Sequence, residues 1–85
     1  MFYVYLLLSE KDNKFYTGST NNLKHRIAEH HDGKVASTAK RRPLGLIYYE
    51  ACLKEKDARA REKYLKSGMG KRYLKNRLKY HLEDL

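Results

Sequence analysis

The chain has 85 residues, which is room for one compact domain with a modest core. The 41% hydrophobic fraction is enough to fold, and the 34% charged fraction lies above the roughly 25% of ordinary globular domains, so we expect a soluble protein and not a disordered chain. The longest apolar run, residues 1–8, is far shorter than the roughly 20 residues of a membrane span, and no signal-peptide leader is recognisable. The single cysteine, Cys52, cannot form a disulfide within the chain, which suits a reducing cytoplasm. We therefore expect one cytoplasmic, monomeric domain over residues 1–85, without a membrane partner.

The charge is strongly positive and unevenly distributed. Nineteen Lys and Arg against ten Asp and Glu give a net charge of +9. Residues 53–82 hold eleven Lys or Arg against three acidic residues, a net charge of +8. Such a basic surface favours phosphate groups and indicates a nucleic-acid partner. The alternative is that basic helices keep a small protein soluble, or contact ribosomes or anionic lipid.

The first part of the chain predicts a β-hairpin. Residues 2–8 are aromatic and branched, residues 14–18 resume that character, and the polar residues 9–13 between them suit a turn. A helix follows, capped by one of residues 20–22, and it ends at Gly33.

The second part predicts a basic loop, a strand and two helices. Residues 33–43 form the loop, and residues 44–51 are strand formers in a short run. One helix covers about residues 55–67, and Gly68 ends it. Another covers about residues 70–83, with a leucine every fourth residue on one face: Leu74, Leu78 and Leu82. Three strands and three helices define a mixed α/β fold.

Three polar side chains interrupt these helical patterns. Arg26 and His30 are four residues apart, so they leave one helix face one turn from each other. A guanidinium beside an imidazole suits a phosphate group, although a solvated helix edge has the same pattern. Glu62 falls on a face expected to be buried, where a carboxylate costs free energy unless it is paired or metal-bound. Arg61 or Lys66 is near enough in sequence to pair with it.

The hairpin contributes two tyrosines and a glycine. Tyr5 and Tyr16 are eleven residues apart, and Gly18 comes just before the first helix. Phenols and a close-approach glycine near a helix N-terminus can face an anion. Each tyrosine taken alone is also a common core aromatic.

In chain order these groups form a series: Tyr3-Val4-Tyr5, Tyr16-Thr17-Gly18, Asn22-Leu23 followed by Arg26 and His30, and then Glu62. This series resembles the GIY-YIG nuclease domain. The resemblance covers roughly residues 2–82 and is strongest to the stand-alone bacterial proteins of that superfamily, whose larger relatives include excision-repair and homing endonucleases. Tyr3 replaces the name-giving glycine and Thr17 replaces isoleucine, both at framework positions.

The resemblance implies a small three-stranded antiparallel sheet flanked by helices, an α+β arrangement, with the active site on one face of the sheet. It implies that Tyr5 helps to take a proton from the attacking water and that Tyr16 positions water or phosphate. Arg26 would stabilise the phosphorane charge, and His30 would assist the proton transfer. Because a tyrosine of pKa about 10 is a poor base at neutral pH, we expect Arg26 and His30 to depress the pKa of Tyr5.

The resemblance also implies a metal site. Glu62 would hold a single Mg²⁺ or Mn²⁺, a hard cation that prefers oxygen ligands. Asn76 matches a late asparagine that often completes such sites. The histidines and the lone cysteine do not have the spacing of a structural zinc site, and no glycine-rich phosphate loop is present.

Two functions of different class follow. The first is a metal-dependent endonuclease that hydrolyses phosphodiester bonds, with DNA expected in preference to RNA and DNA repair as the setting the relatives suggest. The second is a non-catalytic nucleic-acid-binding module that keeps the nuclease fold. Retention of the five motif residues favours the nuclease, and a protein partner that supplies specificity stays open. The residues expected to contact nucleic acid are Lys40, Arg41, Arg42, Lys66, Lys71, Arg72 and Lys75.

Overall fold

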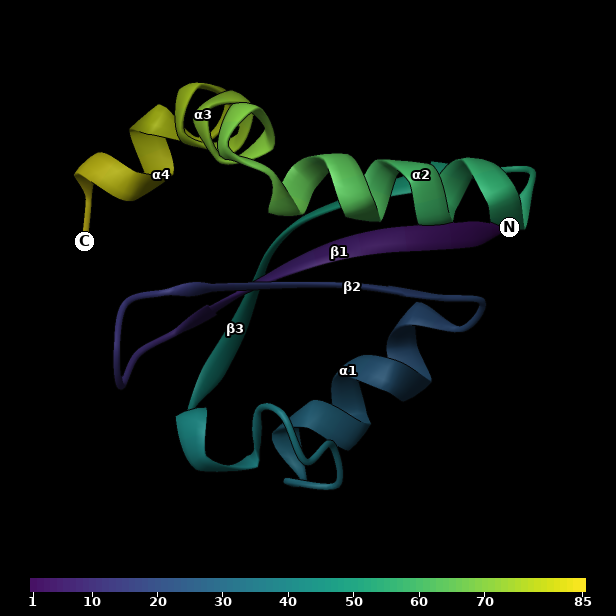
Figure 1. Ribbon diagram of the computed structural model, residues 1–85. Coiled ribbons are helices and arrows are strands. Elements are labelled where there is room, and N and C mark those ends of the chain that lie inside the picture. Colours follow the sequence, from purple (N-terminus) through teal and green to yellow (C-terminus); the bar gives the residue numbers. More distant parts are fainter.

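The computed structural model describes residues 1–85 and confirms the three-stranded antiparallel sheet flanked by helices. The strand order β2-β1-β3 places β1 (Phe2–Ser9) between β2 (Phe15–Thr20) and β3 (Leu44–Cys52). Helix α1 (Leu23–His31) lies on one side of the sheet, and α2 (Glu55–Lys66) lies on the other (Figure 1). The remaining elements are a short 3₁₀ helix η1 (Ala39–Arg41), α3 (Gly68–Arg77) and α4 (Lys79–Glu83). None of the helices is long and apolar enough to cross a membrane.

The central strand β1 is buried on both of its faces. Val4 and Leu6 pack toward α2 and α3, in a core completed by Ala58, Leu65 and Leu74. Tyr5 and Leu7 point the other way, toward α1 and the start of β3. Successive side chains of a strand leave opposite faces, so a strand covered on both sides needs apolar residues throughout. The continuous apolar run at the start of the sequence has this physical cause.

The ends of α1 are set by local hydrogen bonds. Of the three predicted caps, Asn22 is the one used: its side chain accepts a hydrogen bond of 3.1 Å from the backbone N–H of His25. The helix ends at His31, and Gly33 follows with φ of +75°, a left-handed conformation that favours glycine. The predicted start and end of this helix are therefore correct to within two residues.

The C-terminal helices differ from the prediction. The helix predicted over 70–83 begins earlier, at Gly68, and is broken at Leu78, where φ is −109° and ψ is 21°. Leu74 is fully buried and Leu78 packs against the core, whereas Leu82 lies outside it. Leu82 is only half-buried, so packing against the core does not hold one continuous helix.

The connection between α2 and α3 is a single residue. Ser67 ends α2 and caps α3, since its hydroxyl accepts a hydrogen bond of 3.1 Å from the N–H of Gly70. Gly70 is buried against the last turn of α2: a Cβ placed on it would lie 2.5 Å from the Cα of Leu65. The two helices meet this closely only because residue 70 has no side chain.

We expect Gly70→Ala to destabilise the fold by about 1–3 kcal/mol, because the added methyl group meets backbone that cannot move aside. Gly68→Ala is the matched control in the same helix, since a Cβ placed on Gly68 would have no atom within 4 Å. That control should be neutral or about 0.4–1 kcal/mol more stable. Urea unfolding measures both, and equal stabilities would show that the α2–α3 contact tolerates a side chain.

Candidate active site

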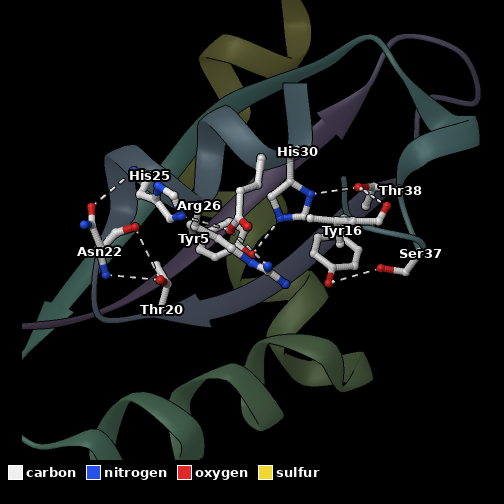
Figure 2. Close-up of polar contacts among 11 residues, drawn as sticks. Tyr5, Tyr16, Thr20, Asn22, His25, Arg26, His30, Ser37 and Thr38 are labelled. Carbon is white, nitrogen blue, oxygen red and sulfur yellow. Dashed lines mark hydrogen bonds and ion pairs between the residues drawn. The ribbon is translucent and has the colours of Figure 1, made fainter. Parts of the chain in front are cut away.

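A buried chain of hydrogen bonds runs through Tyr5, His30 and Thr38. The Tyr5 hydroxyl lies 2.7 Å from Nε2 of His30, and Nδ1 of His30 lies 2.8 Å from Oγ1 of Thr38 (Figure 2). All three side chains are almost completely inaccessible to solvent. They come from β1, from α1 and from the loop before η1, so three separate segments meet at one imidazole.

Tyr16 completes an aromatic cluster around this imidazole. Its ring centroid lies 5.2 Å from that of His30 and 6.5 Å from that of Tyr5. Gly18 stands opposite Tyr5 in the β1–β2 ladder, and a Cβ placed on it would lie 2.6 Å from Cζ of the Tyr5 ring. Gly18 therefore makes the predicted close approach, and the group that it approaches is the Tyr5 ring.

The pKa of Tyr5 is raised, contrary to the expected depression. Burial is the largest effect and raises it, while the Arg26 guanidinium beside the hydroxyl lowers it by less. The pKa of His30 is lowered, first by burial and then by the positive charge of Arg26. Near neutral pH the pair is therefore a protonated phenol facing a neutral imidazole. The sequence-based prediction was wrong because it counted neighbouring charges and not desolvation.

Arg26 lies at the mouth of this cluster. Its side chain is 35% exposed and makes one hydrogen bond of 3.3 Å to Glu29, which leaves other guanidinium donors free. In Figure 2 the guanidinium lies next to the Tyr5 hydroxyl. A phosphate bound by Arg26 would therefore also lie beside Tyr5.

Glu62 lies on α2, on the opposite side of the sheet from Tyr5, and it contacts the edge strand β2. One carboxylate oxygen accepts a hydrogen bond of 2.6 Å from the Ser19 hydroxyl, and the other lies 2.8 Å from Nζ of Lys66. Burial opposes ionisation, but these two donors outweigh it and lower the pKa of Glu62. The predicted partner Lys66 is thus present, whereas Arg61 binds Glu50 instead, at 2.8 Å. Glu62 is ionised, half-buried and close enough to raise the pKa of Tyr5.

The donor set fits a cation held through one carboxylate. No group of three or more His, Cys, Asp or Glu side chains lies close enough together to hold a metal ion. A closed site of several protein ligands does not fit. Mg²⁺ commonly binds through one or two carboxylates and completes its shell with water and substrate phosphate, and the ionised Glu62 can serve in that way. To bind a metal ion through the oxygen that faces Lys66, Glu62 would have to give up its ion pair with the Lys66 ammonium.

Asn76 does not join this cluster. It is exposed on α3 and lines a separate hollow with Tyr64, Met69, Arg72 and Tyr73. The structure brings together Tyr5, Tyr16, Arg26 and His30, places Glu62 across the edge strand, and leaves Asn76 apart.

Two of the basic residues expected to contact nucleic acid make polar contacts within the protein. Arg41 makes an ion pair of 3.0 Å with Asp12, and Arg42 donates to the carbonyl of Ala39 at 3.0 Å. In contrast, Lys66 and Lys71 border a hollow of about 250 Å³ that also includes Tyr16. The other three predicted residues are exposed: Lys40, Arg72 and Lys75.

Two polar residues of the site escaped sequence analysis, namely Thr38 and Ser19. Thr38 lies in a segment interpreted only as a basic loop, and Ser19 sits in the strand next to Gly18. Small hydroxyl residues are common in loops and strand ends, so neither position carries a distinguishing signal in one sequence. Their contacts with His30 and Glu62 exist only in the folded chain.

The fold and this cluster define a nuclease-type domain. Comparison with family models agrees: residues 1–76 match the model described as the GIY-YIG catalytic domain, and the chain belongs to the GIY-YIG family. Membership implies a nuclease-type activity, and nucleases of this family generally use a divalent metal ion.

Several bacterial proteins are similar to the chain. A UPF0213 protein of Pediococcus acidilactici is 42% identical, over 88% of this chain and 82% of the relative. A UPF0213 protein of Clostridium perfringens is 45% identical, over 78% of this chain and 71% of the relative. No solved structure matches the chain.

The lowered pKa of His30 leads to a pH-dependent stability. The unfolded chain takes up a proton on this histidine near its ordinary pKa of 6.5, before the folded protein does. Stability contributed by the neutral imidazole is therefore present above pH 6.5 and is lost as pH falls through the folded pKa. An NMR titration of the ring protons should place the midpoint of His30 below 6.5, with urea stability falling over the same range. A midpoint at or above 6.5 would contradict the neutral, buried imidazole.

Proposed function

We propose that the protein is a metal-dependent endonuclease that hydrolyses phosphodiester bonds of nucleic acid, with DNA preferred to RNA. The hydrogen bond between the Tyr5 hydroxyl and Nε2 of His30, beside a half-exposed Arg26, is the observation that carries the proposal. A buried phenol bonded to a neutral imidazole is an acid next to a base. Beside a guanidinium with free donors, this pair lies where a phosphate can bind.

The proton path runs from water to Tyr5 and from Tyr5 to His30. As the attacking water forms its bond to phosphorus, it gives a proton to the Tyr5 oxygen, and the Tyr5 hydroxyl proton passes to Nε2 of His30. The phenol therefore never has to exist as a free phenolate, which its raised pKa disfavours. His30 is the final base, and its lowered pKa keeps the imidazole neutral and ready to accept.

Positive charges would stabilise the phosphate from two sides, with Arg26 on one side and a metal ion at Glu62 on the other. Arg26 stabilises the equatorial oxygens through its free donors, and Tyr16 positions the water or phosphate at the rim of the cluster. Glu62 would hold one Mg²⁺ or Mn²⁺, which would neutralise charge on the phosphate and on the departing oxygen. Lys66 and Lys71, beside Tyr16, lie where the neighbouring backbone phosphates would pass.

One observation favours a non-catalytic nucleic-acid-binding module instead. Both oxygens of Glu62 already have partners, Ser19 and Lys66, so the carboxylate is satisfied without a metal ion. In that case Glu62 would serve to join α2 to the edge strand β2. The two functions differ in what happens when the charge of Glu62 is removed.

We expect Glu62→Gln to abolish Mg²⁺- or Mn²⁺-dependent cleavage of DNA while the protein stays folded, because the amide can still accept from Ser19 but attracts a cation weakly. Glu55→Gln is the matched control. It removes the same charge from the same helix at an exposed position, where Glu55 pairs only with Arg59 at 3.4 Å. Cleavage is measured under single-turnover conditions over a panel of duplex, branched and single-stranded DNA and RNA.

Binding to the same panel separates the two functions. The Glu62→Gln variant should bind nucleic acid at least as well as the parent protein, with an affinity that falls steeply as salt rises. If the parent protein binds nucleic acid but cleaves nothing with either metal ion, its function is non-catalytic binding and the nuclease proposal is wrong. Full cleavage by Glu62→Gln would make Glu62 a structural ion-pair partner.

A further inference from the structure

Thr38 contacts the site from a segment outside the motif series. Its side chain is fully buried, and Oγ1 lies 2.8 Å from Nδ1 of His30. The segment around it is fixed by backbone bonds: the N–H groups of Thr38 and Ala39 both donate to the carbonyl of Val35, at 3.1 and 2.9 Å. Farther along, the Ser9 hydroxyl at the end of β1 donates to the carbonyl of Arg41 at 2.7 Å. The hydroxyl of Thr38 is therefore held in place against the imidazole.

The partners of Thr38 decide which way its bond to His30 runs. Its hydroxyl also lies 3.5 Å from the carbonyl oxygen of Val35, which can only accept and therefore offers the hydroxyl proton a partner other than His30. The Thr38 oxygen is then an acceptor toward Nδ1 of His30, and Nδ1 carries the proton. Nε2 is left with its lone pair.

The opposite side of the ring is compatible with the same tautomer. The Tyr5 oxygen faces the Arg26 guanidinium, which has only donors. The remaining polar partner of the Tyr5 hydroxyl is Nε2 of His30, at 2.7 Å. The phenol proton can therefore point to Nε2 when that nitrogen is unprotonated, which is the same tautomer. The contacts at both ring nitrogens favour the Nδ1–H tautomer of His30, and neither contact alone requires it.

We propose that Thr38 is a positioning residue that holds His30 in the Nδ1–H tautomer, so that Nε2 is aimed at the Tyr5 hydroxyl and free to accept its proton. The inference rests on the proposed nuclease function for its catalytic consequence, though not for the tautomer itself. The bond made by one ring nitrogen commonly fixes the state of the other, and a misplaced tautomer cannot serve as the base. Thr38 acts through His30 and does not reach the phosphate.

The test combines two variants with two measurements. Thr38→Val keeps the shape of the side chain but loses the hydroxyl, whereas Thr38→Ser keeps the hydroxyl and loses the methyl group. The ¹⁵N chemical shifts of the His30 ring should show a protonated Nδ1 and an unprotonated Nε2 in the parent protein and in Thr38→Ser. Thr38→Val should lose that pattern. Its single-turnover cleavage should fall on the order of 10- to 100-fold, the cost of removing the hydrogen-bond partner that orients a metal-bound histidine, while Thr38→Ser stays within a few-fold.

Each result has a definite meaning. A parent protein with the proton on Nε2 overturns the inference whatever the activity, and so does a Thr38→Val variant with unchanged tautomer and rate. A loss in Thr38→Ser together with a full rate in Thr38→Val would show that side-chain volume matters and the hydroxyl does not, and would also overturn the inference. If no nucleic acid is cleaved by the parent protein but the tautomer shifts as expected, the nuclease function fails and the role of Thr38 in fixing the tautomer stands.

Discussion

The Tyr5 hydroxyl is buried at the centre of the fold and must find its hydrogen-bond partners inside the protein. That constraint begins with β1, which is covered on both faces, so that Tyr5 is almost completely buried. Gly18 lets the phenol lie across the edge strand β2, and α1 brings His30 to its hydroxyl. His30 in turn needs a partner for its second nitrogen, and Thr38 supplies it. The hairpin, α1 and the loop are thus fixed relative to one another by one buried chain of polar contacts.

The polar groups of the candidate site lie on both faces of the sheet. The face covered by α1 holds the hydrogen-bonded Tyr5–His30 pair and Arg26, while the face covered by α2 holds the acidic group, Glu62. They meet across β2, where a bare Gly18 is followed by Ser19, whose hydroxyl binds the Glu62 carboxylate. Under the proposed function, a phosphate at the edge of β2 would lie near the Tyr5–His30 pair and the Arg26 guanidinium on one side. Charge neutralisation can then come from the other side.

Sequence reasoning predicted the elements whose cause is local and missed what depends on burial. The hairpin, the Asn22 cap and the end of α1 follow from nearby residues, and the sheet arrangement followed from the motif series. The break at Leu78 did not, because a regular leucine pattern does not reveal where the core ends. The rise in the pKa of Tyr5 did not either, since desolvation depends on what packs around a group. The catalytic roles of the motif residues are still predictions. The packing of Tyr5 and Tyr16 around His30 is a property of the fold.

Removing the Tyr5 hydroxyl tests most directly whether that buried group carries the proton. Tyr5→Phe deletes one oxygen, and single-turnover cleavage with Mg²⁺ or Mn²⁺ should slow by about 10²–10⁴-fold, the usual range for a general-base contribution. Tyr3→Phe is the control, because Tyr3 lies on the same face of the same strand but contacts Tyr49, with ring centroids 6.2 Å apart. It should cleave at nearly the parent rate, and thermal melts should show that both variants are folded. Full activity of Tyr5→Phe, or equal losses in the two variants, would contradict proton transfer through Tyr5.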